Sequence, residues 1–258
     1  MNVLGWNSEQ YLKFKRERTQ PSVDLADRLT AQSPAAIIDI GCGPGNSTEI
    51  LKKRYPSAAV TGADNSENMV AAAREKYPDI EFILCDASKE LNKLNRKFDI
   101  VFSNACIQWV PDHPKLLREM AALLKEGGEL AVQVPMNYDE PIHKIIGETA
   151  SSEKWRDKFN EPRLFYTLTP EKYYDILAEI FSDFEMWQTV YFHRMKSHWD
   201  IMEWYKSTGL RPYLEVLSET DSEEFEKDIF TEVQKAYPKQ ANGEIIFRFP
   251  RLFFKAIK

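Results

Sequence analysis

Three glycines follow an acidic residue near the start of the chain, in a spacing that is typical of a nucleotide-binding turn. The apolar run 36–38 leads to Asp39, and Gly41, Gly43 and Gly45 come next. Glycine lets the backbone turn tightly and approach a ligand where a Cβ atom would clash. The spacing therefore predicts a ligand site at the end of a buried strand.

The identity of this ligand is narrowed by the residues around the glycines. A dinucleotide fingerprint needs its third glycine where Asn46 stands, and a phosphate-binding P-loop needs a Gly-Lys-Ser/Thr sequence that does not follow. An acid before the first glycine repels a phosphate but suits a cationic amine. This combination indicates S-adenosylmethionine, which carries an ammonium and a sulfonium, and a turn without any ligand is the remaining alternative.

Polar residues also follow the next predicted strands, which cover residues 59–63, 80–84 and 98–103. Asp64 lies 19 positions after Gly45, the distance at which a βαβ unit delivers an acid to the ribose of an adenosine. Ligands of parallel sheets bind at the carboxyl ends of the strands. The polar residues predicted at these ends are Asp39, Asp64, Asp86 and Asn104.

Composition limits the classes of function. The 258 residues are 43% hydrophobic, enough for a sizeable core, and the net charge of −6 argues against a nucleic-acid or anionic-membrane surface. Cys42, Cys85 and Cys106 have neither disulfide nor zinc spacing and predict free thiols in a reducing compartment. No signal-like or membrane-spanning run is found, so we expect a soluble, cytoplasmic protein. We also expect a monomer that binds no metal.

Strands that alternate with helices predict an α/β fold, a mostly parallel sheet with helices on both faces. Capping signals place helix starts at Ser8, at Pro21, at Asn46 or Ser47, and at Ser66. A helix over 116–124 is expected to end at Gly127 and Gly128, before a strand over 129–134.

The rest of the chain departs from simple alternation. We expect one domain over 1–258 with the following parts: an N-terminal helical cover (1–32), a cofactor-binding core (33–135), insertions that form a substrate lid (136–183 and 196–243), and C-terminal strands (184–195 and 244–258).

Several motifs carry a family resemblance. Those within roughly 37–134 resemble class I S-adenosylmethionine-dependent methyltransferases, and they are DIGCGPGNS, GADNSENM, CDAS and FDIVFSNACIQWV. The flanks are similar to trans-aconitate 2-methyltransferases through WNSEQYLKFKRERTQP, SNACIQWVPDH, NYDEPIH, STGLRPYL and NGEIIFRFPRLF. The resemblance implies a Rossmann-like seven-stranded sheet with an antiparallel last strand. It also implies methyl transfer from S-adenosylmethionine to a carboxylate of trans-aconitate or a close polycarboxylate, giving a monomethyl ester and S-adenosylhomocysteine.

The resemblance also implies which residues hold the cofactor. It places the methionine moiety against Gly41, Gly43 and Arg18, the ribose on Asp64, and the adenine near Asp86 and Ala87. The full set of predicted cofactor-binding residues is Arg18, Asp39, Gly41, Gly43, Gly45, Asn46, Asp64, Asn65, Met69, Asp86, Ala87, Asn104 and Trp109.

The methyl acceptor needs other residue types in its binding site than the cofactor does. A carboxylate nucleophile is already ionised at pH 7, so no general base and no catalytic residue is predicted, only positioning. Buried carboxylates need paired donors, and bidentate arginine is the usual one. The predicted substrate-binding residues are Trp6, Tyr11, Gln108, His143, His193, Arg211, Tyr213 and Arg251.

Alternatives stay open for the arginines and for the acceptor. Arg211 and Arg251 have apolar sequence neighbours, which suits either an acceptor carboxylate or an internal ion pair, and Arg248 and Arg251 should face opposite ways on a strand. Arg163 is expected to be a solvated surface charge. The acceptor can also be another small molecule with a reactive oxygen or nitrogen, and a binding module without catalysis is a further alternative.

Overall fold

The computed structural model describes residues 14–159, 165–206 and 208–258, so Trp6, Ser8, Tyr11 and Arg163 lie outside the described residues. The chain divides into two compact units, which we describe one at a time. Unit 1 comprises Met1–Arg18, Met136–Leu164 and Val190–Pro250. Unit 2 comprises Thr19–Pro135, Phe165–Thr189 and Arg251–Lys258.

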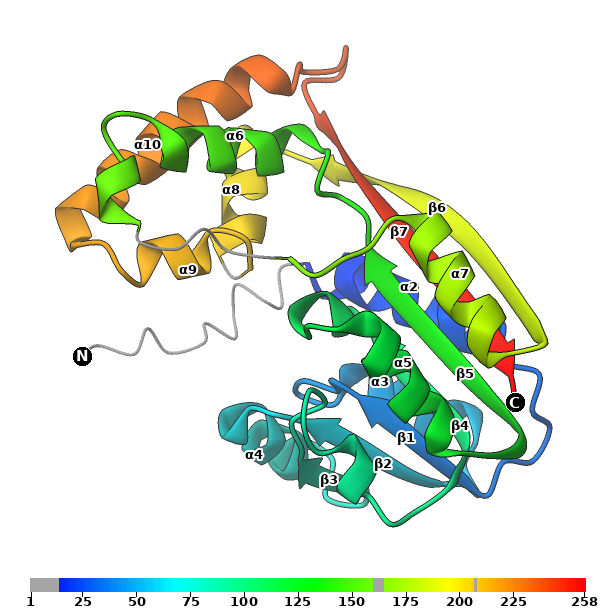
Figure 1. Cartoon of the computed structure of the whole chain (residues 1–258). Coiled ribbons are helices and arrows are strands. Elements are labelled where there is room, and N and C mark those ends of the chain that lie inside the picture. The colour runs from blue at the N-terminus through cyan, green and yellow to red at the C-terminus, as the bar shows by residue number, and fades with distance from the viewer. Residues whose placement is uncertain (1–13, 160–164, 207) are drawn as a thin grey trace. The chain divides into compact units, whose positions relative to one another are not determined.

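A seven-stranded sheet has the strand order β3-β2-β1-β4-β5-β7-β6 (Figure 1). The strands are β1 (Ala36–Ile40), β2 (Ala59–Asp64), β3 (Glu81–Leu84), β4 (Phe98–Asn104), β5 (Leu124–Pro135), β6 (Asp183–Met195) and β7 (Ile245–Ile257). β1 to β5 pair in parallel, whereas β7 pairs with β5 in the antiparallel direction. The prediction of a mostly parallel sheet with an antiparallel last strand is confirmed.

The helices follow the amphipathic segments of the sequence. They are α2 (Lys15–Asp27), α3 (Asn46–Arg54), α4 (Glu67–Lys76), α5 (His113–Ala122), α6 (Pro141–Ser151), α7 (Pro170–Ile180), α8 (His198–Lys206), α9 (Arg211–Leu214) and α10 (Glu219–Ala236). Short 3-10 turns cover η1 (Leu91–Lys93), η2 (Ile107–Trp109) and η3 (Arg156–Lys158). None of the helices in the described part of the chain is long and apolar enough to cross a membrane.

In unit 2, different elements cover the two faces of the sheet. Phe253 and Phe254 are neighbours on β7 and therefore point to opposite faces. The ring of Phe254 packs against Tyr173 of α7, which lies beside α5 (Figure 1). The ring of Phe253 stacks on Trp187, over which the guanidinium of Arg28 lies at the end of α2. α7 thus packs on one face of the sheet, and the end of α2 lies over the other.

Two predicted helix starts are wrong. Pro21 lies inside α2 and does not open a second helix, since proline costs one backbone hydrogen bond while buried Leu25 and Leu29 keep the segment packed. The residue that caps α3 is Gly45, at φ +85°, not Asn46 or Ser47. Ser66 does cap α4, because its hydroxyl accepts from the backbone N–H of Met69.

The boundary between α5 and β5 is also shifted. Asp112 caps α5 and the helix begins at His113, before the predicted start at residue 116. β5 begins at Leu124 and already contains Gly127 and Gly128, which were expected to end the helix. The Gly127 N–H donates to the carbonyl of Lys258 at 3.0 Å, so pairing with the chain end extends this strand.

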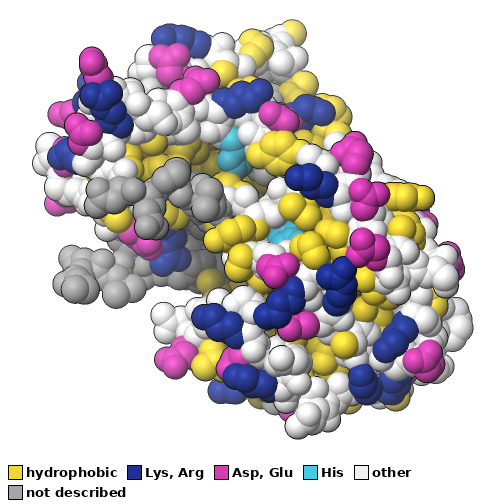
Figure 2. All heavy atoms as spheres, viewed as in Figure 1, with side chains coloured by type: hydrophobic (Ala, Val, Ile, Leu, Met, Phe, Trp, Pro, Cys, Tyr) yellow, Lys and Arg dark blue, Asp and Glu magenta, His cyan; other side chains and the backbone are white. Residues whose placement is uncertain are grey.

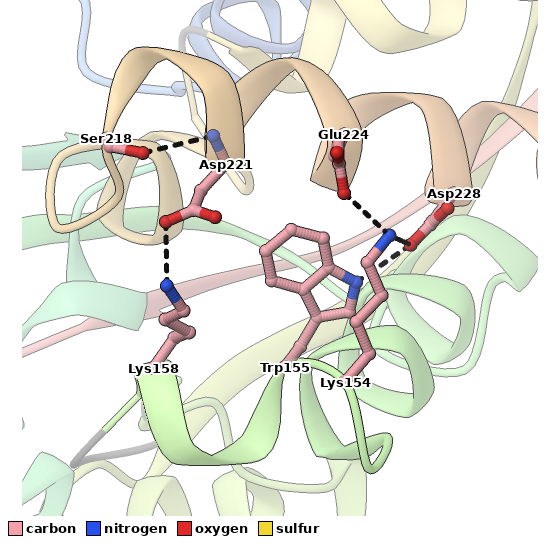
Figure 3. A network of polar contacts seen from close by, with 7 residues as sticks. All are labelled: Lys154, Trp155, Lys158, Ser218, Asp221, Glu224 and Asp228. Carbon is pink, nitrogen blue, oxygen red and sulfur yellow. Dashed lines mark hydrogen bonds and ion pairs between the residues drawn. The ribbon is translucent and has the colours of Figure 1, made fainter.

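Unit 1 is organised around the long helix α10, which packs against α6 and α8. Ser218 caps α10 by accepting from the N–H of Asp221 at 3.1 Å, and Phe225, Ile229 and Val233 form its buried stripe. On the polar side, the Trp155 indole donates to Asp228 at 2.8 Å (Figure 3). Lysines 154 and 158 pair there with the acidic residues Asp221, Glu224 and Asp228.

Candidate functional site

The glycine turn after β1 has the geometry that its sequence predicts. Gly41, Gly43 and Gly45 have φ values of +75°, +54° and +85°, which side chains rarely adopt. A Cβ atom on Gly41 would lie 2.2 Å from the Cβ and Sγ atoms of Cys106. The Gly41 N–H donates to the carbonyl of Ala63 at 2.7 Å, which ties the turn to β2. The turn therefore presents backbone, not side chains, at the end of β1.

Asp39 is a fully buried carboxylate beside this turn. Its Oδ2 accepts from the hydroxyls of Ser47 and Thr48 on α3, at 2.6 and 2.7 Å. Its Oδ1 has no hydrogen-bond partner among the described residues. Burial raises the pKa of Asp39 to about 6, against the two hydroxyl bonds that lower it, and the negative charge of Asp64 raises it further. An open, buried carboxylate oxygen of this kind suits a cationic ligand.

Asp64 holds the turn from the end of β2. Its Oδ2 accepts from the Gly43 N–H at 2.9 Å and its Oδ1 from the Ser66 N–H at 3.0 Å. Each carboxylate oxygen has a second lone pair, so the side chain can still accept from two hydroxyl groups. Of its predicted neighbours, Asn65 is exposed and Met69 is half-buried.

The end of β3 borders a hollow. Asp86 accepts from the backbone N–H and the hydroxyl of Ser88, at 2.9 and 2.6 Å, and these bonds lower the pKa of Asp86. The hollow has a volume of about 150 Å³ and is lined by Ala87, Ser88, Pro111, Asp112, Lys115, Leu116 and Glu119. Ala87 is thus placed beside a space that a small ring can enter.

The end of β4 carries two amides with open oxygens. The Oδ1 of Asn104 and the Oε1 of Gln108 have no hydrogen-bond partner in the described part of the chain. Gln108 Nε2 donates to the carbonyl of Ala105 at 2.7 Å, which holds this side chain in place. Trp109 is half-exposed, and its ring lies 5.1 Å from that of Phe165.

Other predicted cofactor-binding residues have mainly local roles. Asn46 is the first residue of α3, and its Oδ1 accepts from Lys76 Nζ at 2.9 Å.

No cluster of three or more His, Cys, Asp and Glu side chains that could hold a metal ion occurs among the described residues. All three cysteines lie in the described ranges and are free thiols, as predicted.

Three predicted residues come together in unit 1, around Trp204 and Tyr205 of α8. The guanidinium of Arg18 lies 5.0 Å above the Trp204 ring, and its Nη2 donates to the Trp204 carbonyl at 3.1 Å. The His193 ring stacks on Trp204 at 5.0 Å, and the His143 ring meets Tyr205 edge-on at 5.1 Å. Arg18, predicted with the cofactor, thus shares an aromatic cluster with two predicted substrate residues.

Arg211 lies at the surface, although its sequence neighbours are apolar. The side chain is about 42% exposed, and its Nε donates to Glu215 one helical turn later at 2.6 Å. The reason is the short helix α9, which turns this residue outward and places a carboxylate within reach. Tyr213, from the same helix, packs on the rings of Phe159 and Phe225.

Arg251 is deeply buried, in contrast to Arg211. The side chain is 4% exposed and its Nη1 donates to Oε1 of Gln133 at 3.0 Å. Arg248, which was predicted to face the other way, is half-exposed and pairs with Glu140 at 2.5 Å. Sequence reasoning missed Gln133, although a glutamine inside the apolar run 130–134 was a visible signal.

Comparisons with known proteins agree with this geometry. A family profile described as a methyltransferase domain matches residues 37–128. Trans-aconitate 2-methyltransferase of Rhodopseudomonas palustris (strain BisB5) is 42% identical over 99% of this chain and 100% of that protein. The enzyme of the same name from Escherichia coli (strain K12 / DH10B) is 40% identical over 98% of each chain.

Solved structures share the fold. The YcgJ protein from Bacillus subtilis has a TM-score of 0.62 at 16% identity and covers 93% of this chain and 98% of its own. Phosphoethanolamine N-methyltransferase 2 from Haemonchus contortus, solved with S-adenosyl-L-methionine, has a TM-score of 0.56 at 20% identity, over 93% of this chain and 52% of its own. These neighbours show the fold, and the full-length sequence identity shows the family. The chain belongs to the trans-aconitate 2-methyltransferase family of methyltransferases.

Proposed function

We propose that this protein transfers a methyl group from S-adenosylmethionine to a carboxylate of trans-aconitate, or of a closely related small polycarboxylate. The products are a monomethyl ester and S-adenosylhomocysteine. One observation carries the proposal: the similarity to trans-aconitate 2-methyltransferases extends over 99% of the chain, far beyond the residues 37–128 that match the general methyltransferase profile. The acceptor-specific part of a methyltransferase lies outside the shared core, and here that part is similar too.

The residues at the strand ends of unit 2 fit the cofactor. The open oxygen of buried Asp39 matches an ammonium, Asp64 can accept from a ribose diol, and the hollow beside Ala87 admits a flat ring. A side chain at Gly41 would clash with Cys106, so this turn of the backbone beside Asp39 requires glycine. When bound, S-adenosylmethionine supplies the activated methyl group on a sulfonium.

The protein must also position the acceptor carboxylate against the methyl group and remove water from around it. A carboxylate acceptor needs no proton removed at neutral pH, so these residues must hold it in line with the methyl group and keep water away. We propose that the rigid strand ends supply this alignment, because Asp64 is fixed by two backbone N–H groups and Gln108 by its own turn. No general base is assigned.

We further propose that the chain works as one methyltransferase domain, in which the insertions 136–183 and 196–243 form a substrate lid and His143 and His193 bind the acceptor. Ring packing on Trp204 and Tyr205 supports roles for His193 and His143, since it holds both imidazoles in defined orientations. Arg18, which the sequence assigns to the cofactor, is held by the same aromatic cluster.

The enzyme is proposed to act as a monomer on a free small molecule in a reducing, cytoplasmic compartment. The free state of all three cysteines supports such a compartment. The net charge of −6 and the mixed signs of the charges on the face seen in Figure 2 do not favour a nucleic-acid substrate. Size-exclusion chromatography with light scattering tests the oligomeric state.

The decisive test is mass spectrometry of reactions that contain isotopically labelled S-adenosylmethionine and a panel of di- and tricarboxylates, amines and phenols. We expect trans-aconitate to gain one labelled methyl group. Mild base should release this group, because an ester bond holds it. The proposal is overturned if trans-aconitate stays unlabelled while an amine or phenol is methylated. Cofactor binding without turnover on any acceptor would instead identify a binding module.

A further inference from the structure

Gln133 of β5 and Arg251 of β7 form a buried polar pair within unit 2. Arg251 Nη1 donates to Gln133 Oε1 at 3.0 Å, and Gln133 has no exposed surface. The strand register places Phe253 opposite Gln133 and Pro135 opposite Arg251, so the two side chains project from the same face of the sheet. The antiparallel pairing of β5 with β7 therefore fixes this pair.

The orientation of the Gln133 amide follows from the chemistry of its partner. A guanidinium carries donors only, so the amide atom that faces Arg251 is the oxygen. The amide nitrogen, Nε2, must point away from Arg251, and it has no hydrogen-bond partner within residues 14–159, 165–206 and 208–258. A buried N–H group without an acceptor is unfavourable, which predicts an acceptor ligand at this position.

The position of the pair relates it to the proposed cofactor site. Gln133 lies beside Asn104, the last residue of β4, and Asp39 pairs with Phe102 two positions earlier on that strand. All these side chains project from one face, at or near the carboxyl ends of their strands. β5 is two strands from β1, which corresponds to about 10 Å. A small acceptor beside the cofactor can span this distance.

The two ends of this row of polar groups suit ligands of opposite charge. Near β1 and β4 the open atoms are oxygens, Asp39 Oδ1 and Asn104 Oδ1, which suit a cation. At β5 and β7 the groups are donors, the amide nitrogen of Gln133 and the guanidinium of Arg251, which suit an anion. An amide donor beside a buried guanidinium is a binding arrangement for a carboxylate.

We propose that Gln133 and Arg251 together bind a carboxylate of the acceptor that is not methylated. This inference rests on the proposed function. One carboxylate oxygen accepts from Gln133 Nε2 and the other from an N–H of Arg251. A carboxylate paired in this way is a poorer nucleophile, so the pair orients the acceptor and leaves a second carboxylate to react. Acceptors with at least two carboxylates are thereby selected.

The methionine end of the cofactor also carries a carboxylate, so the test must separate the two sources. Gln133→Met removes the donor at similar volume, and Gln133→Glu also neutralises Arg251. Arg251→Lys keeps the charge but loses the fork geometry. Gln188→Met, on the exposed side of β6, is the matched control and should behave like the wild type. The acceptor probes are trans-aconitate and analogues in which one carboxylate at a time is replaced by a carboxamide.

We expect the wild type to lose kcat/KM about 100-fold on one analogue, the one without the bound carboxylate. Gln133→Met should raise the KM for trans-aconitate about 10-fold, and Gln133→Glu about 100-fold, because a charge repels the acceptor. On the analogue that lacks the bound carboxylate, Gln133→Met should cause no further loss. The Kd for S-adenosylhomocysteine, measured by calorimetry, should stay within about twofold in all variants.

If Gln133→Met lowers kcat/KM equally on every analogue, the proposal is overturned, because a glutamine with only a structural role would have the same effect on all of them. A weaker affinity for S-adenosylhomocysteine with an unchanged acceptor KM assigns the pair to the cofactor and also overturns it. If the Gln133 variants fail to bind S-adenosylhomocysteine because they do not fold, Arg251→Lys decides by the same comparison of analogues. Failure of the proposed function is read separately, as a wild type that methylates no carboxylate in the panel.

Discussion

Two sets of buried polar side chains, one in each unit of this protein, differ in their partners. In unit 1, Glu140 pairs with Arg248 at 2.5 Å and Lys206 pairs with Glu226 at 2.6 Å. At the strand ends of unit 2, atoms of Asp39, Asn104 and Gln133 have no hydrogen-bond partner among the described residues. A buried polar group with a hydrogen-bond partner is satisfied within the fold, whereas a buried group without one lowers stability. Such a group therefore indicates that a ligand binds there.

The difference also concerns the backbone. The parallel strands of unit 2 support a turn at positive φ, where Gly41 lies too close to Cys106 for any side chain. Unit 1 is held by side-chain packing, with Trp155, Phe225 and Trp204 in its core. At the strand ends of unit 2, positive-φ glycines and buried polar atoms without a described partner thus occur together, so variants there should fail in a different way from variants of the paired charges in unit 1.

The largest expected effect is at Gly41. Gly41→Ala should weaken S-adenosylmethionine binding at least 100-fold, because its Cβ would clash with Cys106 and the turn must shift. Isothermal titration calorimetry measures the loss. The matched control is Gly127→Ala, at φ +71° with nothing within 4 Å of the added Cβ, which should lower stability by about 1–2 kcal/mol without a change in affinity. Equal affinities in both variants would contradict the assignment of the turn.

A variant in unit 1 should show the reverse pattern. Arg248→Met leaves Glu140, which is 6% exposed, buried without its cation and should lower the free energy of unfolding by about 2–3 kcal/mol. Affinity for S-adenosylmethionine should be unchanged. Denaturant unfolding measures the first quantity and calorimetry the second. The double variant Arg248→Met/Glu140→Leu should recover most of the loss, and a failure to recover would refute the ion-pair explanation.

Cofactor affinity should depend on pH through Asp39. Because its pKa is about 6 in the free protein, the cationic ligand must displace a proton below this pH, and affinity should fall about tenfold between pH 7 and pH 5. The stability of the free protein should change in the other direction. The folded state holds this proton more tightly than the unfolded chain, so the contribution is full below about pH 4 and is lost as pH rises through 6.

Asp39→Asn is the control for both pH effects. This variant should bind S-adenosylmethionine weakly, with the same affinity at pH 5 and pH 7, and its stability should lack the component that disappears near pH 6. Titrations of the wild type and the variant at both pH values provide the comparison. A wild-type affinity that does not change between these pH values would show that Asp39 does not contact the cation.

The smallest effect is expected at Arg211. Its pair with Glu215 is exposed, so Arg211→Ala should change stability by no more than about 0.5 kcal/mol and leave the acceptor KM within about twofold. Steady-state kinetics with trans-aconitate checks this result. A KM increase of more than about tenfold would restore the acceptor-binding role that the sequence predicted for Arg211.

Much of the cofactor side could be predicted from the sequence because its signals are local. Positive-φ glycines, a polar residue at or after the end of each of the first four strands and a serine cap are encoded within a few residues, and Gly41, Asp64 and Ser66 lie as expected. Errors arose where distant contacts decided a boundary. β5 starts early because Leu124 pairs with Phe98 of β4 and the Gly127 N–H donates to the Lys258 carbonyl, and both contacts join segments that are apart in sequence.

The sequence by itself determined the alternation of strands and helices and the glycine turn that marks the cofactor end, because hydrophobic periodicity and backbone sterics are local properties. The antiparallel last strand was expected from the family resemblance alone. Only the tertiary structure decided which arginine is buried. Arg211 and Arg251 have similarly apolar sequence neighbours, yet α9 turns one toward solvent while the pairing of β5 with β7 buries the other against Gln133. Burial and partners depend on which strands become neighbours, and that information is distributed over the whole chain.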